Sequence, residues 1–202
     1  LNGTTNSTGI FTDLSVGNYN VIVLDGNTCI ENLPFLIDSA DPIVAQIDTQ
    51  TEVDCFGNND GTIQVSATGG NTNFTFNLGT QSNSTGFFQN LPVGNYTISI
   101  TDGSNCETTI TTTITQPTEI SPSISTSQNV LCFGENNGSL QVQASGGIGN
   151  FNFTLGTETN STGLFQNLIA GDYNITITDE NNCESTLTVT IFQPDAIITS
   201  IS

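Results

Sequence analysis

A spacing of 77 residues recurs through the whole chain and indicates a tandem-repeat protein. The segment CFGNNDG begins at Cys55, and the related segment CFGENNG begins 77 positions later, at Cys132. The motif Asn-Ser-Thr-Gly begins with the same spacing at Asn6, Asn83 and Asn160. Self-similarity at a fixed spacing is the signature of repeat architectures, in which each repeat is one structural unit. We therefore look for one fold that is used several times.

A Gln-Pro dipeptide that ends at Pro117 and recurs at Pro194 marks the repeat boundaries. We expect the C-terminal part of one repeat over residues 1–41, complete repeats over 42–118 and 119–195, and the start of a further repeat over 196–202. Both ends divide a repeat, so we expect a longer array, with any export signal outside this sequence.

The spacing of apolar residues inside a repeat is two, which indicates β-strands. In the first complete repeat Ile63, Val65 and Ala67 alternate with polar residues, and similar patterns cover 74–78, 96–100 and 110–114. Glycine pairs, Pro-Val-Gly and Asp-Gly-Ser-Asn separate these segments and suit tight turns. The sequence shows no helical pattern. Six or seven short strands in 77 residues predict an all-β fold, a small immunoglobulin-like β-sandwich.

Charge excludes several classes of function. The chain has 19 acidic residues, no Lys, Arg or His, and a net charge of −19. Binding to nucleic acid requires cationic side chains that neutralise phosphates, and an anionic membrane surface repels an acidic chain. We therefore expect no nucleic-acid partner and no membrane insertion. Enough apolar residues remain for a core, since 35 % of the chain is hydrophobic.

The same composition argues against an enzyme. Without His or Lys the chain lacks an imidazole base, a Ser-His nucleophile, a Schiff base and a P-loop. Two carboxylates could in principle hydrolyse a glycoside, but tandem copies of a small sandwich leave little room for a cleft. We expect no catalytic residues.

The cysteines indicate an oxidising compartment. Each complete repeat has one pair, Cys55 with Cys106 and Cys132 with Cys183, separated by 51 positions. We expect a disulfide within each repeat, and a partner for Cys29 outside this sequence. A metal site is the alternative, but one cysteine pair without His lacks a ligand set. Disulfides favour an extracellular or cell-surface location.

The repeat resembles a known family through the order of its motifs. These are Cys-Phe-Gly-x-Asn-x-Gly, Gly-Gly, Phe-x-Phe, Phe-Gln-Asn-Leu, Gly-Asn-Tyr, Thr-Asp-x-x-x-Cys and Gln-Pro. Together they resemble the SprB-type repeat of large surface proteins of the Bacteroidota, known from gliding adhesins. The resemblance covers both complete repeats and the partial one. It implies a secreted, repetitive, Ig-like surface protein, although the absence of Lys departs from what we expect of such repeats.

Asparagine, threonine and serine supply candidate glycosylation sites. Nine Asn-x-Ser/Thr sequons are present, although a chain so rich in these residues produces several by chance. A short Asp-Ser-Ala segment around Ser39 resembles the signal for O-linked glycans in the Bacteroidota. The candidates are Asn2, Asn6, Asn73, Asn83, Asn95, Asn137, Asn152, Asn160, Asn174 and Ser39.

Clusters of acidic and amide residues could supply oxygen ligands to Ca²⁺. One cluster surrounds Asp54 and Asp60, and another begins at Asp179. Neither has the ligand order of an EF-hand, and turn formation by Asp and Asn explains both clusters equally well. We expect no cofactor, with Ca²⁺ as the alternative.

These observations predict a non-enzymatic structural protein, a tandem-repeat extracellular fibre or surface stalk with a glycan coat. Its partners would be further copies of the repeat and covalent glycans. The alternative is an adhesin module whose loops bind a glycan or a surface. Aromatic binding platforms would favour the adhesin, but the chain has no Trp and three Tyr.

Overall fold

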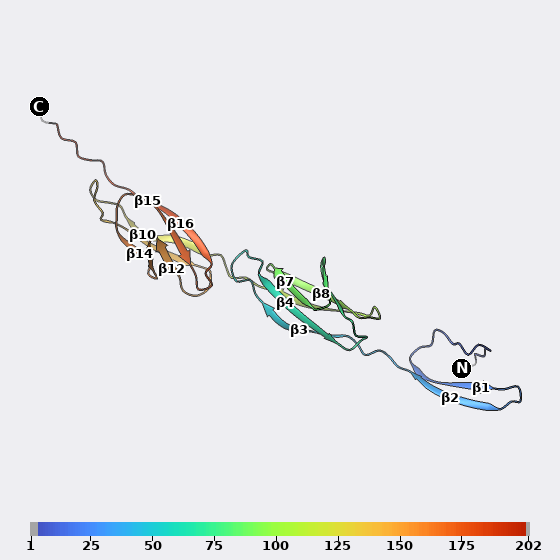
Figure 1. Cartoon of the computed structure of the whole chain (residues 1–202). Helices are drawn as coiled ribbons and strands as arrows, with labels where there is room; N and C mark the ends of the chain where they lie inside the picture. The colour runs from blue at the N-terminus through green and yellow to red at the C-terminus, as the bar shows by residue number, and fades with distance from the viewer. Residues whose placement is uncertain (1–3, 201–202) are drawn as a thin grey trace.

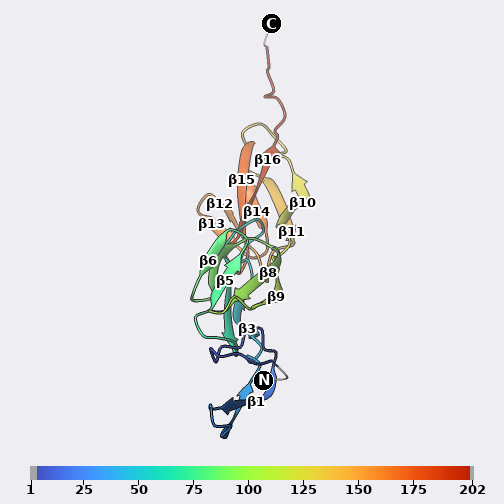
Figure 2. The ribbon, with the colours of Figure 1, turned by 90° about the vertical axis from the view of Figure 1, so that its right-hand side faces the viewer.

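The computed structural model describes residues 4–200. Figure 1 shows two small β-sandwiches and a hairpin that follow one another along an elongated chain, and the perpendicular view in Figure 2 shows the same end-to-end order. None of the described residues lies in a helix. The all-β fold expected from the two-residue pattern is confirmed.

The first complete sandwich, which we call the first module, has seven antiparallel strands in two sheets. One sheet has the order β3-β4-β7 and the other the order β6-β5-β8-β9. This division of seven strands into three and four is that of a small immunoglobulin-like domain. The strands are β3 (Val44–Thr51), β4 (Gly61–Thr68), β5 (Thr75–Leu78), β6 (Gln81–Asn83), β7 (Phe87–Leu91), β8 (Gly94–Thr101) and β9 (Glu107–Ile114).

The second module repeats this arrangement with every strand displaced by 77 positions. Its sheets have the orders β10-β11-β14 and β13-β12-β15-β16. The strands are β10 (Ser121–Gln128), β11 (Gly138–Ser145), β12 (Asn152–Leu155), β13 (Glu158–Asn160), β14 (Leu164–Leu168), β15 (Gly171–Thr178) and β16 (Glu184–Ile191). The strand expected from the sequence is present in each case. Two additional strands, the short β6 and β13, were not expected, because the alternating apolar pattern does not extend to these polar segments.

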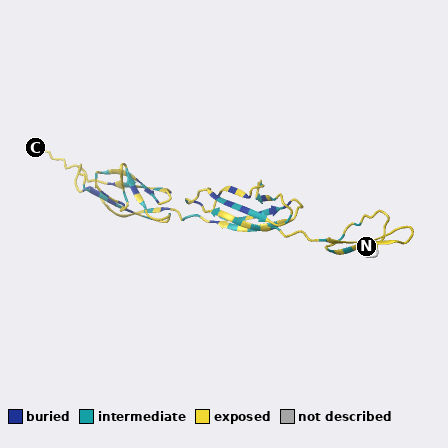
Figure 3. Ribbon diagram, turned by 60° about the horizontal axis from the view of Figure 1, so that its bottom comes forward, coloured by how far each residue is buried: buried dark blue, intermediate teal, exposed yellow. Residues whose placement is uncertain are grey.

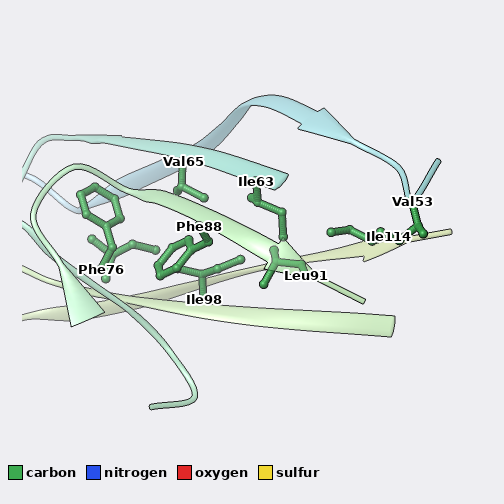
Figure 4. Close-up of a cluster of buried hydrophobic side chains, with 9 residues drawn as sticks. Val53, Ile63, Val65, Phe76, Phe88, Leu91, Ile98 and Ile114 are labelled. Carbon is green, nitrogen blue, oxygen red and sulfur yellow. The ribbon is translucent and has the colours of Figure 1, made fainter. Parts of the chain in front are cut away.

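The alternating pattern places apolar side chains between the two sheets. In the first module Ile63 and Val65 from β4 face Ile98 and Ile100 from β8. Phe88 of β7 lies in the middle of this cluster (Figure 4). Figure 3 shows the same concentration of buried residues inside each module. Burial of each large apolar side chain contributes roughly 1.5–3 kcal/mol, so this cluster is the main source of the module's stability.

The loop that precedes β7 explains the glycine of the Asn-Ser-Thr-Gly motif. Asn83 Oδ1 accepts hydrogen bonds from the backbone N–H groups of Thr85 and Gly86, at 3.0 and 2.7 Å. Gly86 has a φ of +70°, and a Cβ atom there would lie 2.0 Å from the carbonyl oxygen of Val65. Only glycine fits, because any larger residue would both adopt a disfavoured backbone conformation and collide with β4.

A tyrosine at the start of β8 closes the turn between β7 and β8. The hydroxyl of Tyr96 donates a 2.6 Å hydrogen bond to the carbonyl oxygen of Pro92, four residues upstream. Tyr173 and Tyr19 make the same bond to Ile169 and Ser15. This is the tyrosine corner of immunoglobulin-like sandwiches. It gives a structural reason for the Gly-Asn/Asp-Tyr motif in every copy.

We predict that Tyr96→Phe destabilises the first module by about 1 kcal/mol, because it removes one hydrogen bond and keeps the ring. Urea denaturation of the wild-type chain and the variant measures the change. Tyr173→Phe should have the same effect on the second module only. Equal unfolding curves for Tyr96→Phe and the wild type would show that the corner does not stabilise the fold.

The N-terminal hairpin consists of β1 (Gly17–Leu24) and β2 (Ile30–Ile37). It pairs in the register of β8 and β9, since Gly17 lies opposite Ile37 as Gly94 lies opposite Ile114. Its apolar side chains are exposed, among them Ile22, Leu24, Ile30 and Leu33. The hairpin is therefore the counterpart of β8 and β9, and within residues 4–200 no second sheet covers its apolar side chains.

Candidate functional site

The most distinctive chemistry of the chain lies at the junction between the two modules. One half of the junction is the loop after Thr51, which carries Cys55. The backbone N–H of Gly57 donates to Oε1 of Gln116 at 3.0 Å, and the N–H of Val53 donates to the carbonyl oxygen of Thr115. The glutamine of the Gln-Pro dipeptide therefore holds the cysteine loop against the end of β9.

The other half is the turn between β15 and β16, which carries Cys183. Both oxygens of the Asp179 carboxylate bind backbone N–H groups. Oδ1 accepts from Asn181 and Cys183, both at 2.9 Å, and Oδ2 accepts from Ile148 at 2.9 Å. Asp179 is buried, and it fixes the position of the cysteine. The aspartate of the Thr-Asp-x-x-x-Cys motif is thus a loop anchor.

The structure contains a disulfide between Cys55 and Cys183, whose Cα atoms are 5.6 Å apart and 128 positions apart in sequence. The expected pairings Cys55 with Cys106 and Cys132 with Cys183 are wrong. In the first module, Cys55 lies at the end near Thr115, whereas Cys106 lies in the turn at the opposite end of β8 and β9. An eight-residue strand spans roughly 25 Å, and a disulfide requires Cα atoms within about 7 Å.

In this disulfide the first cysteine of the first complete repeat pairs with the second cysteine of the next repeat. Cys29, Cys106 and Cys132 are free and exposed. Cys106 and Cys29 occupy the same position as Cys183, and Cys132 occupies the position of Cys55. The residue spacing alone does not show at which end of a sandwich a loop emerges, so it does not distinguish a disulfide within a repeat from one between repeats.

Further contacts across the junction support the disulfide. Asn181 Nδ2 donates a 3.2 Å hydrogen bond to the carbonyl oxygen of Asp54, and Cys183 Sγ lies 3.4 Å from the same oxygen. In the linker, Thr118 accepts a hydrogen bond from the N–H of Gly147 at 2.9 Å. Ile120 packs into the core of the second module. The linker, the disulfide and these contacts together restrain the two modules relative to each other.

A shallow cleft of about 390 Å³ lies at this junction. Residues from both modules line it, including Cys55, Phe56 and Pro117 from the first and Ile120, Asp179 and Cys183 from the second. The described residues contain no group of three or more His, Cys, Asp or Glu that could hold a metal ion. The junction combines backbone anchors on both sides with a covalent link between the modules.

The first module has the same anchor at its N-terminal end. Asp102 is buried, and its carboxylate accepts hydrogen bonds from the backbone N–H groups of Asn71, Cys106 and Ser104, each at 2.8 Å. The bond from Asn71 is the main cause that holds the pKa of Asp102 below its ordinary value of 3.8, with smaller contributions from Cys106 and Ser104. Charge-assisted bonds of this kind stabilise the ionised form.

The lowered pKa of Asp102 predicts that the unfolding free energy of the first module depends on pH. A carboxylate whose pKa is lower in the folded state stabilises the fold above its unfolded pKa, and this stabilisation is lost as the pH falls below about 3.8. We expect Asp102→Asn to lower the unfolding free energy of the first module at pH 6 and to have a smaller effect at pH 2.5. Urea denaturation at both values measures the two differences. A difference that does not change with pH would contradict this role of Asp102.

The repeated sequons at Asn83 and Asn160 have structural roles. Nδ2 of Asn83 donates to the carbonyl oxygen of Phe87 at 3.0 Å, and Nδ2 of Asn160 donates to that of Leu164 at 3.1 Å. Asn6 makes the equivalent bond to Ile10. The recurrence of these asparagines is thus explained by the loop that they organise, whether or not they carry glycans.

The remaining candidate glycosylation sites differ in how far they are exposed to solvent. Asn137 is half-buried and bonded to the backbone of Leu131 and to Glu135. Asn2 lies outside the described residues. The exposed candidates are Asn73, Asn95, Asn152, Asn174 and Ser39. Asn95 and Asn174 stand on β8 and β15, where their Oδ1 atoms accept hydrogen bonds from Thr113 and Thr188 on the neighbouring strands.

The outer faces of the four-stranded sheets are rich in threonine. On β8 and β9, Thr97 lies opposite Thr111 and Asn95 lies opposite Thr113, and all four are exposed. Threonine is favoured on exposed strands, so this surface requires no function. It nevertheless presents closely spaced hydroxyl and amide groups.

The acidic clusters proposed as Ca²⁺ ligands act within their own loops. Asp60 accepts hydrogen bonds from the N–H of Asp54 at 3.1 Å and from Nδ2 of Asn58 at 3.2 Å. Glu180, in the second cluster, accepts from Nδ2 of Asn150 at 2.8 Å. These bonds favour the interpretation that the clusters shape turns.

Comparison with known protein families gives one match to this chain. Two segments of this chain, residues 47–83 and 124–160, match a model of the SprB repeat. The two matches are 77 positions apart and begin in the same strand of each module, β3 and β10. The resemblance expected from the sequence is confirmed over these two segments, one in each complete repeat. No protein with a curated description matches the chain.

Solved structures resemble the chain at low sequence identity. A 282-residue C-terminal fragment of intimin, in complex with the intimin-binding domain of its translocated receptor, has 16 % identity and a TM-score of 0.39. That match covers 76 % of this chain and 64 % of the fragment, so the chain spans less than two thirds of it. Extracellular domains 3–5 of Drosophila OTK have 14 % identity, a TM-score of 0.35, and coverage of 89 % and 72 %.

The ectodomain of human desmocollin-1 has 15 % identity and a TM-score of 0.37, with coverage of 88 % of this chain and 42 % of that ectodomain. Among the described residues, no helix is long and apolar enough to cross a membrane.

Proposed function

We propose that this chain is part of a non-enzymatic structural protein, a tandem-repeat extracellular fibre or surface stalk. The SprB-repeat match and the Ig-like sandwiches support a role as a surface adhesin or structural repeat. The observation that carries the finer proposal is the Cys55–Cys183 disulfide. It joins successive modules, so it stabilises the array and not only its parts.

The junction supports a stiff array for a mechanical reason. A peptide linker alone allows two domains to move relative to each other. Here the linker passes Pro117, and a disulfide provides a second covalent connection beside it. Two connections between the same pair of modules restrict bending more than one does. A disulfide also requires an oxidising environment, which supports an extracellular or cell-surface location.

We further propose that glycans coat the exposed Thr/Asn faces of β8–β9 and β15–β16. The exposed sequons Asn95 and Asn174 lie on these faces among threonine hydroxyls. Intact mass measurement of the native protein tests this proposal. A mass above that of the peptide, with modified residues mapped to these strands, would support it, whereas an unmodified mass would refute the glycan coat alone.

Electron microscopy of native extracellular material tests the fibre. We expect straight filaments with an axial spacing of roughly 35–45 Å per module, given strands of about 20 Å plus loops. Flexible chains of separate beads attached to cells would refute the stiff fibre and favour the alternative, an adhesin stalk.

A further inference from the structure

Two edge strands of the first module hold a hydroxyl and an amide against each other. Gln50 stands on β3 and Thr112 on β9, the first and last strands of the module, which belong to different sheets. The hydroxyl of Thr112 donates a 2.5 Å hydrogen bond to Oε1 of Gln50. Because a carbonyl oxygen lies about 1.2 Å from its carbon, Oγ1 of Thr112 lies within about 3.7 Å of the amide carbon Cδ of Gln50. A nucleophile and an amide carbonyl are therefore in contact.

The amide of Gln50 is fixed in place by three hydrogen bonds. Besides accepting from Thr112, it donates through Nε2 to Oε1 of Glu52 at 2.6 Å and to the carbonyl oxygen of Thr113 at 2.9 Å. Gln50 and Thr112 are both half-buried. Holding two groups in a fixed relative position raises their effective concentration by several orders of magnitude. A reaction that is very slow between free molecules can therefore proceed between these two side chains.

Glu52 places a base at the same point. Its Oε1 binds the nitrogen of Gln50, and its Oε2 accepts hydrogen bonds from the hydroxyl and the backbone N–H of Thr115. The backbone bond from Thr115 is the main cause that holds the pKa of Glu52 below its ordinary value of 4.5, with smaller contributions from the side chains of Gln50 and Thr115. At neutral pH Glu52 is therefore an ionised carboxylate that can accept a proton and pass it to the amide nitrogen.

The second module lacks all three groups. At the equivalent positions, Ser127, Asn129 and Val189 replace Gln50, Glu52 and Thr112. Oδ1 of Asn129 still accepts a hydrogen bond from the backbone N–H of Phe192, as Glu52 does from that of Thr115. An amide is thus sufficient to anchor this end of a sandwich. The hydroxyl, the amide and the carboxylate occur together in one module, and the fold of the other does not require them.

We propose that Thr112 and Gln50 form an ester bond that joins the first and last strands of the first module. Oγ1 of Thr112 attacks Cδ of Gln50, so that an O–C bond forms and the C–N bond of the amide breaks. The hydroxyl proton passes to the leaving nitrogen with the Glu52 carboxylate as its carrier, and ammonia departs. The products are one ester and one ammonia molecule, and the step requires no oxidant or other co-reactant.

The ester closes a covalent loop between residues 62 positions apart. Tension that enters the module before Gln50 and leaves it after Thr112 then passes through the ester, and the segment between these residues is not extended. The inference goes beyond the proposed fibre and does not depend on it, because the bond is measured in a single purified chain.

Intact mass of the whole chain, produced in a host that adds no glycans, tests the bond. After unfolding and full reduction, we expect the chain to be lighter than its sequence by the mass of one ammonia molecule. Thr112→Val removes the hydroxyl, keeps the side-chain shape and should restore the full mass. Thr111→Val, at the adjacent position of β9, is the matched control and should keep the deficit.

Two results of the mass measurement would overturn the proposal. One is a full mass for the unsubstituted chain. The other is a deficit that persists in Thr112→Val, because cyclisation of an asparagine side chain also releases ammonia. Digestion then locates the bond: a segment with Gln50 should be joined to one with Thr112, and mild alkali, which hydrolyses esters, should separate them. A cross-link between other residues would equally contradict the assignment.

Glu52→Gln tests the proton carrier. The glutamine keeps hydrogen-bonding groups at this position, as Asn129 does in the second module, so we expect the variant to fold. The ester should form at least about tenfold more slowly, measured as the growth of the mass deficit with time after synthesis. Glu107→Gln, on β9 of the same module, is the control and should leave the rate unchanged. Equal rates for Glu52→Gln and the unsubstituted chain would show that Glu52 does not carry the proton.

Discussion

Phe88→Ala is expected to unfold the first module in the reduced chain while the second module stays folded. The Phe88 side chain is 1 % exposed and lies between the sheets, in contact with the central cluster of apolar residues. Phe→Ala substitutions in a core cost about 3–5 kcal/mol. A core in a domain of this size rarely supplies more than about 3–5 kcal/mol in total. The substitution therefore removes most or all of the module's stability.

The neighbouring residue provides the matched control. Phe87 is adjacent in β7 but points outward, and its side chain is 44 % exposed. We expect Phe87→Ala to cost less than about 1 kcal/mol. Two-dimensional ¹H–¹⁵N spectra in the presence of reductant distinguish the modules, because only signals of the first module should collapse in Phe88→Ala. Similar losses for the two variants would contradict the burial of Phe88 as the source of the effect, and a larger loss for Phe87→Ala would mean that the register of β7 is shifted by one residue.

The strands were predictable because their signal is local. Ile63 and Val65, or Ile98 and Ile100, alternate with polar residues, and this alternation decides both the strand and its buried face. The short β6 has no such signal, since Gln81–Asn83 is polar throughout. It forms because its backbone pairs with β5 after a tight turn. Backbone pairing of this kind leaves little trace in the side chains.

The junction was only partly predictable. The sequence showed that Cys55, Gln116 and Asp179 belong to recurring motifs, but it did not show what each residue contacts. Gln116 reaches a cysteine loop 59 positions away, and Asp179 binds the backbone of a segment 31 positions away. The predicted disulfide partner of Cys55 was wrong for the same reason. Which loops emerge at the same end of a sandwich depends on strand order, and the residue spacing does not contain that information.

The tyrosine corner was the signal that the sequence analysis did not use. Tyr96 follows Pro92 by four positions and opens an alternating strand, which is the pattern of the corner at the start of the penultimate strand. This pattern fixes the orientation of β8 within the sandwich. With β8 and β9 oriented, Cys106 falls at the far end from the Gln-Pro dipeptide, and a disulfide between modules becomes the natural expectation.

Reduction of the Cys55–Cys183 disulfide is expected to change one cooperative unfolding transition into two. When the first module unfolds and the second stays folded, the disulfide closes a loop from Cys55 to the linker, because the linker and Cys183 are held at the same end of the second module. That loop has about 60 residues, and closing it disfavours unfolding by about 4 kcal/mol in the chain-entropy model. The same argument applies to the second module.

Once one module has unfolded, the disulfide adds little to the free energy of unfolding the other. With both modules unfolded, the disulfide closes a single loop of 128 residues, whose closure is worth only about 0.6 kcal/mol more, because the entropy grows with the logarithm of loop length. The disulfide therefore adds a large free-energy cost to the unfolding of whichever module unfolds first and only a small cost to the unfolding of the other. The two modules of the oxidised chain consequently unfold together. A disulfide inside each repeat would have stabilised both modules without coupling them.

Urea denaturation of a Cys29→Ser/Cys106→Ser/Cys132→Ser chain, with and without reductant, measures this coupling. The triple variant keeps the Cys55–Cys183 disulfide and removes the exposed thiols that could exchange with it. We expect one transition when the chain is oxidised, and two transitions at lower urea when it is reduced. The wild-type chain carrying Phe88→Ala should show the complementary effect, since its oxidised form regains stability in the first module. Identical curves with and without reductant would show that the disulfide restrains orientation alone and that the modules of the array unfold independently.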